Sequence, residues 1–364
     1  MTQRLVALLG RRDEPTDAVE EYCHYLGAAL RAHGFELEVT RLPWVARGWP
    51  AALRELAARA ADWRGRWVCV QYTALAWSTR GFPSRFLSVL NVLLRAGVRV
   101  AVVYHDAAPF SGSRALDKLR RVVQLQIMRR SLLRSELGVF TVPLSAVSWL
   151  GAPPHNAAFV PVGANLSLPA SKESKTSKGS QDVLRVAVFG ITGGEAGRWE
   201  SARIIDAVRF AAARIGRLEL RAFGRHADDC ESLLREGLRD AHVDVQVKGV
   251  LPPEEVAKEL SSADVMLFVR GPISTRRGSA IAGIACGLPV VAERGTETAG
   301  PIEEAGVALV SADKPREFNE ALLRVLTDQD YRAQLAQRSR LAQEKYFSWQ
   351  AIAARYAEEL KGTR

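Results

Sequence analysis

Gly271-Pro-Ile-Ser-Thr-Arg-Arg-Gly-Ser-Ala-Ile-Ala-Gly-Ile-Ala-Cys-Gly-Leu-Pro-Val-Val291 is the stretch that decides the fold. The apolar run 265–269 before it predicts a buried strand, and the pattern 279–286, which a glycine ends, predicts a helix. Between them lies a polar loop that carries Arg276 and Arg277. A loop ahead of a helix N-terminus can bind an anion through backbone N–H groups and cationic side chains. A solvated surface loop fits the local pattern equally well.

Strands and helices alternate on both sides of this stretch. We expect strands at 5–9, 36–40, 67–72, 99–104, 138–142, 158–162, 184–189, 218–223, 243–247, 265–269, 290–292 and 308–310. We expect helices at 17–33, 83–96, 201–215, 228–238, 253–261, 279–286, 315–327 and over most of 330–360. Short valine-rich runs separated by helices are typical of parallel sheets covered by helices. The sequence therefore predicts an α/β protein with two doubly wound, Rossmann-like domains, which bind ligands at the carboxyl ends of their strands.

A change in composition divides the chain. Residues 171–181 carry no large apolar side chain and are typical of an exposed linker. The predicted organisation is a domain at 1–168, a linker at 169–183, a domain at 184–345 and a C-terminal helix at 346–364.

Composition indicates a globular protein of 364 residues with no stretch apolar enough to span a membrane. The chain begins directly with a predicted strand, so we expect no secretory signal. Its four cysteines lie far apart without metal-site spacing, which is typical of a reducing compartment. We therefore expect a cytoplasmic protein without a metal site.

The positive charge is concentrated in the first half. Residues 1–168 hold 21 Lys and Arg against 12 Asp and Glu, a net charge of +9 out of the total +10. This asymmetry indicates an anionic partner. No aromatic side chains alternate with the basic ones in a recognisable module, so we do not expect nucleic acid.

A helix predicted over 114–129 would carry much of this charge. Helical spacing places one group of residues on its basic face, Arg114, Lys118, Arg121 and Arg129, and another on the opposite face, Leu116, Leu119, Val123 and Ile127. The favoured interpretation is a helix that packs on the core and leaves its basic face in solvent. The alternative is a peripheral contact with the anionic inner face of a membrane.

Several short motifs together resemble one known family. They are Gly249-Val-Leu-Pro-Pro-Glu-Glu-Val256, Leu260-Ser-Ser-Ala-Asp264, Ala285-Cys-Gly-Leu-Pro-Val-Val291, Pro161-Val-Gly-Ala-Asn165 and His105-Asp106. In this combination the chain resembles retaining glycosyltransferases of the GT-B fold, family four, most strongly over 185–310. The resemblance implies two domains facing a cleft, an acceptor-side domain first and a donor domain second, and a C-terminal helix that returns to the first domain.

The resemblance also implies an activity. A sugar would pass from a nucleotide-diphospho sugar to a hydroxyl acceptor (a glycan, glycolipid or small molecule) in polysaccharide or glycoconjugate biosynthesis, without a metal or other cofactor. His105, Arg276 and Arg277 would be catalytic, since the arginines can stabilise the charge of the departing diphosphate. The predicted donor-binding residues are Thr192, Gly193, Gly194, Arg198, Ser274, Gly278, Ser279 and Glu297, and the acceptor-side residues are Arg11, Arg12 and Asp106. Structural roles remain open for several, such as a helix cap for Arg198 and a loop cap for Asp106.

The chain departs from the family at two glutamates. Their positions hold Ser274 and Ala282, and alanine cannot form the hydrogen bond that glutamate makes. Glu297 could replace one of them. The alternative function is therefore an inactive relative that keeps the fold and binds a nucleotide or a partner protein.

Overall fold

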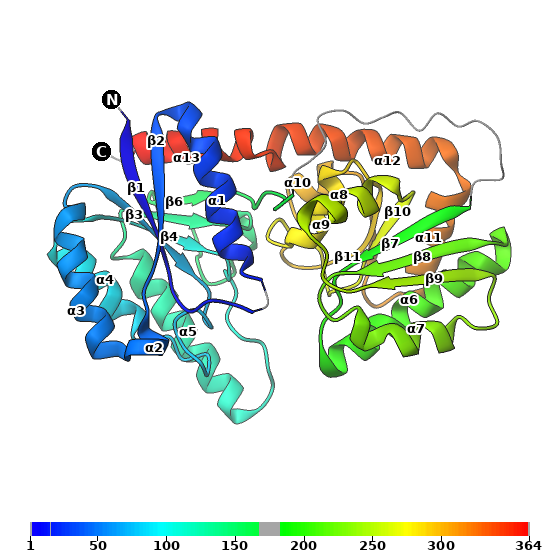
Figure 1. The fold of residues 1–364 in the computed structure, drawn as a ribbon, viewed down its shortest axis with the longest axis horizontal. Helices are drawn as coiled ribbons and strands as arrows, with labels where there is room; N and C mark the ends of the chain where they lie inside the picture. Colours follow the sequence, from blue (N-terminus) through cyan, green and yellow to red (C-terminus); the bar gives the residue numbers. More distant parts are fainter. Residues whose placement is uncertain (1, 15, 167–182, 363–364) are drawn as a thin grey trace. The chain divides into compact units, whose positions relative to one another are not determined.

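The computed structural model describes residues 2–14, 16–166 and 183–362. The chain divides into two compact units, one of residues 1–162 with 349–364 and the other of residues 163–348. The predicted linker 169–183 lies outside the described residues except for its last position. Figure 1 shows a parallel sheet with helices on both faces in each unit.

The first unit contains a six-stranded parallel sheet in the order β2-β1-β3-β4-β5-β6. Its strands are β1 (Gln3–Leu9), β2 (Phe35–Arg41), β3 (Trp67–Tyr72), β4 (Arg99–Tyr104), β5 (Leu137–Phe140) and β6 (Ala157–Phe159). Its helices before residue 162 are α1 (Ala18–Leu30), α2 (Trp44–Arg47), α3 (Trp49–Ala60), α4 (Phe86–Arg95) and α5 (Ala115–Leu132). Helices α3, α4 and α5 cover one face of the sheet. The predicted strands are confirmed, although β6 ends before the predicted residue 162.

Helix α13 (Trp349–Gly362) completes the other face of the first unit beside α1. The Tyr22 hydroxyl of α1 donates a hydrogen bond to the Tyr356 hydroxyl at 2.8 Å. The Trp349 ring stacks on Tyr25 with 5.5 Å between centroids. The predicted return of the C-terminal helix to the first domain is therefore confirmed.

The second unit contains a six-stranded parallel sheet in the order β12-β11-β10-β7-β8-β9. Its strands are β7 (Leu184–Phe189), β8 (Leu218–Phe223), β9 (Val243–Lys248), β10 (Val265–Phe268), β11 (Val290–Arg294) and β12 (Val307–Ser311). Its helices are α6 (Gly194–Ile215), α7 (Glu231–Gly237), α8 (Pro253–Ser262), α9 (Gly278–Ala285), α10 (Pro301–Glu304), α11 (Pro315–Thr327) and α12 (Gln329–Ala342). Helices α6 and α11 cover one face, and α8 and α9 the other.

Three predicted helices differ in extent. Helix α6 begins at Gly194, seven residues before the predicted start. The predicted helix 228–238 is divided into a 3-10 turn (Asp228–Cys230) and α7. The predicted helical segment 330–360 is interrupted, because a π-helical turn (Gln343–Phe347) and Ser348 separate α12 from α13.

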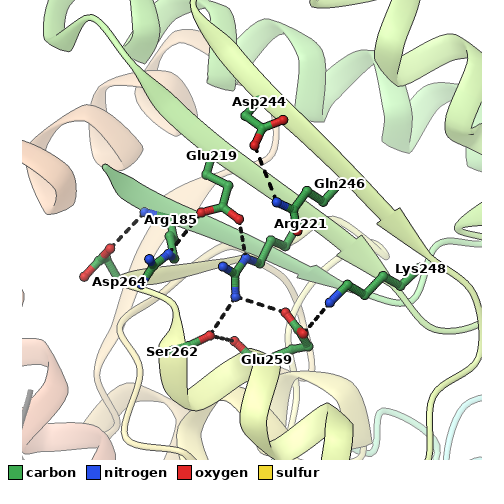
Figure 2. A network of polar contacts seen from close by, with 9 residues as sticks. All are labelled: Arg185, Glu219, Arg221, Asp244, Gln246, Lys248, Glu259, Ser262 and Asp264. Atoms are coloured by element: carbon green, nitrogen blue, oxygen red, sulfur yellow. Dashed lines mark hydrogen bonds and ion pairs between the residues drawn. The ribbon is translucent and has the colours of Figure 1, made fainter. Parts of the chain in front are cut away.

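A network of charged side chains ties β7 and β8 to α8 (Figure 2). Glu219 accepts hydrogen bonds from Arg221 at 2.6 Å and from Arg185 at 3.0 Å. Arg221 continues the network to Glu259 of α8 at 3.1 Å. Burial acts to raise the pKa of Glu219, but its two arginine partners lower it below the usual value. Asp264, from the family-like motif, accepts the Arg185 N–H at 2.8 Å and so has a structural role at the start of β7.

Each sheet has one point at which the chain reverses its direction of winding. In the first sheet this point lies between β1 and β3, and in the second between β7 and β10. Loops that leave adjacent strands in opposite directions open a crevice at the carboxyl edge, which is the usual ligand site of such folds. We therefore expect ligand sites at these two points.

Candidate functional site

A pocket of about 210 Å³ lies at the switch point of the first sheet. Residues after β1, after β3 and at the N-terminus of α1 line it, together with Asp106 after β4. The three predicted acceptor-side residues Arg11, Arg12 and Asp106 all line this one pocket. The carboxyl-edge location therefore unites residues that are about 95 positions apart in the chain.

Gly10 brings the two loops of this pocket together. A Cβ at this position would overlap the carbonyl oxygen of Ala76. The next residue, Arg11, donates its backbone N–H to the same oxygen at 2.7 Å. Arg41 donates to the Gly10 carbonyl at 2.8 Å and to Asp17, the N-cap of α1, at 2.9 Å. These bonds hold the backbone under the pocket, while the Arg12 side chain stays exposed.

His105 lies beside this pocket and is held by Gln71. Its Nε2 is 2.8 Å from Oε1 of Gln71, whose amide nitrogen donates to the carbonyl of Cys69. Oε1 must therefore accept from a protonated Nε2. Burial lowers the pKa of His105 to about 4, against an opposing effect of Asp17. His105 is thus a neutral ring with its Nε2–H already engaged.

Gln71 itself lines the pocket and is buried. Sequence reasoning did not single it out. The only signal was its place at the carboxyl end of β3, and a glutamine inside an apolar strand could have been noted for that reason.

Arg270 occupies the switch point of the second sheet. It follows β10 by two residues, and its Nη1 would lie 3.4 Å from a Cβ placed on Gly190, which follows β7 with φ +78°. Its Nε is buried and has no hydrogen-bond partner among the described residues. Burial lowers the pKa of Arg270, Glu200 acts to raise it, and the neighbouring Arg225 lowers it further. Arg270 thus experiences one nearby carboxylate and a second guanidinium, and sequence reasoning missed both arginines.

The loop 190–194 and the start of α6 form the other side of this point. Gly193 is the N-cap of α6, and no side chain caps the helix there. A Cβ on Gly193 would lie 3.0 Å from the His226 ring, so the loop after β8 approaches closely. Gly193 and Gly194 therefore present the uncapped N-terminus of a 22-residue helix, three residues after Gly190, which Arg270 approaches.

Two predicted donor residues lie differently from expectation. The Thr192 N–H donates to the buried carboxylate of Glu200 at 2.7 Å, so it is not available to a phosphate in this conformation. Arg198 lies inside α6 rather than in the loop before it, and it is exposed. The reason is Gly197: a Cβ there would overlap the Thr192 carbonyl, so this glycine permits a helical turn where we expected a loop.

The two residues predicted for phosphate and ribose, Arg276 and Glu297, pair with each other. Arg276 Nε and Nη2 lie 2.7 and 3.4 Å from the two carboxylate oxygens of Glu297. The pair joins the loop after β10 to the loop after β11. It is half-buried, and it holds the Arg276 guanidinium in one orientation.

The remaining predicted residues lie around the start of α9. Arg277 is its N-cap residue, and Gly278 and Ser279 form its first turn. Ser274 is only 1% exposed, and its hydroxyl has no hydrogen-bond partner among the described residues. Ala282, at the second glutamate position, is also buried. The two positions that depart from the family are thus inside the protein.

A hollow of about 450 Å³ lies next to this region on the second unit. Trp199, which is 74% exposed, and the ion pair of Arg203 with Glu293 line it. Val269, the residue before Arg270, lines it as well. The hollow therefore adjoins the carboxyl end of β10, and we did not predict it.

The described residues can be assessed for metal-ligand groups and for membrane-spanning helices. No group of three or more His, Cys, Asp or Glu in this part of the chain is placed to hold a metal ion. No helix in the same part is both long and apolar enough to cross a bilayer.

One part of the second unit matches a known protein family. Residues 196–328 match the family model described as glycosyl transferases group 1. A search of curated proteins found no match.

Solved structures match over the whole chain. The sucrose-phosphate synthase of Thermosynechococcus elongatus has a TM-score of 0.70 at 18% identity, over 99% of this chain and 98% of that one. HepE of Anabaena in complex with UDP-glucose has a TM-score of 0.65 at 13% identity, over 99% of both chains. A putative UDP-N-acetylglucosamine 2-epimerase of Listeria monocytogenes has a TM-score of 0.62 at 12% identity, over 100% and 96%. These likenesses confirm the predicted fold, two doubly wound domains of the GT-B type.

Proposed function

We propose that this chain, which contains a group 1 glycosyltransferase domain, transfers a sugar from a nucleotide-diphospho sugar to a hydroxyl acceptor. The second unit would bind the donor, and the pocket of the first unit would receive the acceptor. The transfer would be retaining and independent of metal ions. The domain boundaries at 1–168, 169–183, 184–345 and 346–364 are part of this proposal.

The observation that carries the proposal is the cationic switch point of the second sheet. A buried guanidinium N–H without a hydrogen-bond partner is costly, and an anionic ligand can supply the missing acceptor. The Nε of Arg270 is such a group among the described residues, and Arg225 adds a second positive charge that acts on it. The uncapped N-terminus of α6 contributes N–H groups and a positive dipole end. Together they suit a diphosphate.

These groups also suit the chemistry of transfer. Negative charge grows on the diphosphate as the bond to the sugar breaks, and fixed donors that stabilise it lower the barrier. Arg270 is positioned by burial and Arg276 by Glu297, so neither must reorganise when the charge develops. Arg277, at the start of α9, would add a third guanidinium. Gly278 and Ser279 would contribute the backbone N–H groups at the N-terminus of α9. Glu297 would bind the ribose with a carboxylate that it also shares with Arg276.

Two structures of one structural relative, HepE of Anabaena, support a uridine donor. HepE has been solved with UDP-glucose and with UDP and glucose. We therefore use UDP and UDP-glucose as the first probes of the second unit.

The pocket of the first unit suits a hydroxyl-bearing acceptor. Carboxylates of Asp17 and Asp106 and the amide of Gln71 line it beside Arg11 and Arg12. Its volume is below that of pockets that enclose whole drug-sized ligands, so it would receive one end of an acceptor. His105 would act through Gln71, because its Nε2–H is engaged there.

One observation supports the alternative function, that of an inactive relative that binds a nucleotide or a partner protein. Ser274 and Ala282, which stand where the family has glutamates, are both buried, so neither offers a ligand a surface group. In that case the donor site would bind a nucleotide without turnover.

Calorimetric titration with UDP tests the donor site. Replacing Arg270 by Met keeps an unbranched side chain and removes the charge, and we expect UDP affinity to fall by about 10- to 100-fold, the usual effect of losing a charge-assisted hydrogen bond. Arg239→Met, an exposed arginine on the same unit, is the matched control and should bind UDP as the wild type does. If the wild type binds no nucleoside diphosphate, both functions are overturned.

Turnover separates the two functions. Release of UDP from UDP-glucose, and from a panel of other nucleotide sugars, should be measured for the wild type and for Arg276→Ala/Arg277→Ala. An active transferase should lose about 100-fold or more in the double variant. Nucleotide binding without turnover of any donor would favour the inactive relative.

We also propose a cytoplasmic location at the inner face of a membrane. Four buried free cysteines suit a reducing compartment. Arg114, Lys118, Arg121 and Arg129 would meet anionic headgroups.

A further inference from the structure

Helix α5 exposes apolar side chains that the sequence assigned to the core. Leu116 is 52% exposed, Leu119 is 54% and Val122 is 56%. Leu133, just after the helix, is 84% exposed. Of the apolar face predicted for this helix, only Val123 and Ile127 point inward. The favoured interpretation, a helix that packs on the core and leaves its basic face in solvent, is therefore confirmed for Val123, Ile127 and the basic face, but the predicted apolar positions Leu116 and Leu119 face solvent.

Polar groups take the inner face instead. Gln124 is buried; its Oε1 accepts the Phe110 N–H at 2.7 Å and its Nε2 donates to the Gly81 carbonyl at 2.9 Å. Asp117 is also buried and pairs within the helix with Arg120 at 2.8 Å, and Arg120 donates to the Arg80 carbonyl at 2.9 Å. Specific hydrogen bonds thus hold α5 to the unit, so the exposed leucines are not needed to anchor it.

The exposed apolar side chains form one ridge. Leu116, Leu119 and Val122 are three positions apart, and at about 100° per residue such positions follow one another along a helix surface. In Figure 1 the N-terminal turns of α5, at the foot of the first unit, extend past the ends of the strands. The ridge therefore lies on a part of the helix that is open to an external partner.

Basic side chains border this ridge. Arg114, Lys118, Arg121 and Arg129 lie together on one side of it by the same helical spacing, and all four are exposed. Within the described residues no ion pair involves any of the four. The one acidic residue of the helix is Asp117, on the inner face. The outer surface of α5 thus combines apolar and cationic side chains without an acidic one.

We propose that this surface docks the protein on an anionic lipid bilayer, with Leu116, Leu119 and Val122 inserted below the headgroups. An amphipathic helix binds in this way when its apolar side chains enter the acyl boundary and its lysines and arginines meet lipid phosphates. Charge complementarity selects this partner, because the four cations have no ion-pair partner in the part of the chain that the structure describes and residues 1–168 carry a net charge of +9. The inference deepens the proposed membrane location and does not rest on the proposed transferase activity, since an inactive relative would dock equally.

Sedimentation with vesicles tests the docking. The full-length protein should sediment with vesicles that contain phosphatidylglycerol and not with pure phosphatidylcholine, and less at high salt. Reversal of Lys118, Arg121 and Arg129 to Glu should reduce partitioning ~30-fold or more. The control is Arg54→Glu/Arg217→Glu/Arg239→Glu, which changes net charge equally at exposed positions elsewhere and should lose far less. Equal loss in both triple variants would overturn a specific surface.

A fluorescent label tests the insertion. The four native cysteines are buried, so an environment-sensitive thiol dye can be directed to Leu119→Cys. Its emission should shift to shorter wavelength only with anionic vesicles. Leu341→Cys, a matched position at 53% exposure on α12, should not respond. An unchanged label at 119 in the vesicle-bound protein would overturn insertion.

A second copy of the chain is the competing occupant. Leu116→Ser/Leu119→Ser/Val122→Ser should abolish vesicle binding and leave the sedimentation coefficient without lipid unchanged. Circular dichroism and the melting temperature should stay at wild-type values, because the three side chains are exposed. If the wild type instead self-associates and the triple variant does not, the ridge is a contact between copies and the lipid proposal is overturned.

Discussion

Single residues decide the chemistry at both switch points, and their environments differ. Arg270 is a cation in a place where burial disfavours its charge. Arg276, by contrast, forms an ion pair with Glu297, which also orients its guanidinium. His105 is kept neutral, since a buried imidazolium would lack a carboxylate in hydrogen-bond contact. At this scale the structure adds Arg225, Gln71 and Arg270 to the residues that the sequence indicated.

The pKa of His105 predicts how stability depends on pH. Its pKa is about 4 in the folded state and about 6.5 when unfolded, so between these values the unfolded state binds more protons. The free energy of unfolding should therefore rise with pH from about 4 to about 6.5, with His105 contributing up to ~3 kcal/mol. Urea unfolding at pH 5 and pH 7 measures this difference.

His105→Gln should flatten that rise, because glutamine does not titrate. His242→Gln, which changes an exposed histidine, serves as the control and should keep the wild-type slope. A His105→Gln slope equal to that of the wild type would show that another group carries the dependence.

Elements are shaped by close backbone approaches that a local pattern does not reveal. Helix α6 extends to Gly194 because Gly197 packs without a Cβ against the Thr192 carbonyl. In helix α5, tertiary contacts changed the orientation of the helix and not its start. Its apolar residues had the period of a core-facing stripe, but the buried Gln124 bonds Phe110 and Gly81 on the inner face, and part of the stripe faces solvent. Periodicity predicted both helices, and tertiary contacts set the start of one and the orientation of the other.

Gly197→Ala tests the close approach in α6. The added Cβ overlaps a backbone oxygen, which cannot rotate away, so the first turn of α6 must shift. We expect a loss of about 1 to 3 kcal/mol in the free energy of unfolding, and weaker UDP binding because the helix N-terminus moves. Chemical unfolding and calorimetry measure the two effects.

Gly278→Ala is the matched control for stability. A Cβ there meets nothing within 4 Å, and this glycine also begins a helix. Its free energy of unfolding should stay within about 0.5 kcal/mol of the wild type. If Gly197→Ala were equally neutral, the helix start would not depend on that contact.

At the scale of the whole molecule, the first unit is completed by the far end of the chain. Helix α13 packs on α1, and Tyr356 is 1% exposed against Tyr22, 334 positions earlier. The resemblance implied this return, whereas local pattern indicated only a helix. The first unit therefore depends on a segment that lies beyond the whole second unit in the chain.

Tyr356→Ala should destabilise the first unit by about 3 to 5 kcal/mol, since it leaves a large cavity and a buried Tyr22 hydroxyl without its partner. Hydrogen exchange should increase in β1 and α1 and remain unchanged in the second unit. Tyr331→Ala, on α12 of the second unit, should show the reverse distribution. Equal exchange in both units of the Tyr356 variant would contradict the division into two units.

The sequence by itself determined the class of fold and the place of nearly every strand, because these follow from local periodicity. Short motifs such as Ala285-Cys-Gly-Leu-Pro-Val-Val291 carried the resemblance of the second unit to group 1 glycosyltransferases. Only the tertiary structure decided which charges are buried, paired or exposed: Arg270 beside Gly190, Arg276 on Glu297, His105 on Gln71, and the leucines of α5 in solvent. The physical reason is that burial and hydrogen-bond partners come from segments distant in the chain. A local pattern predicts the shape of an element and not the partner that meets it.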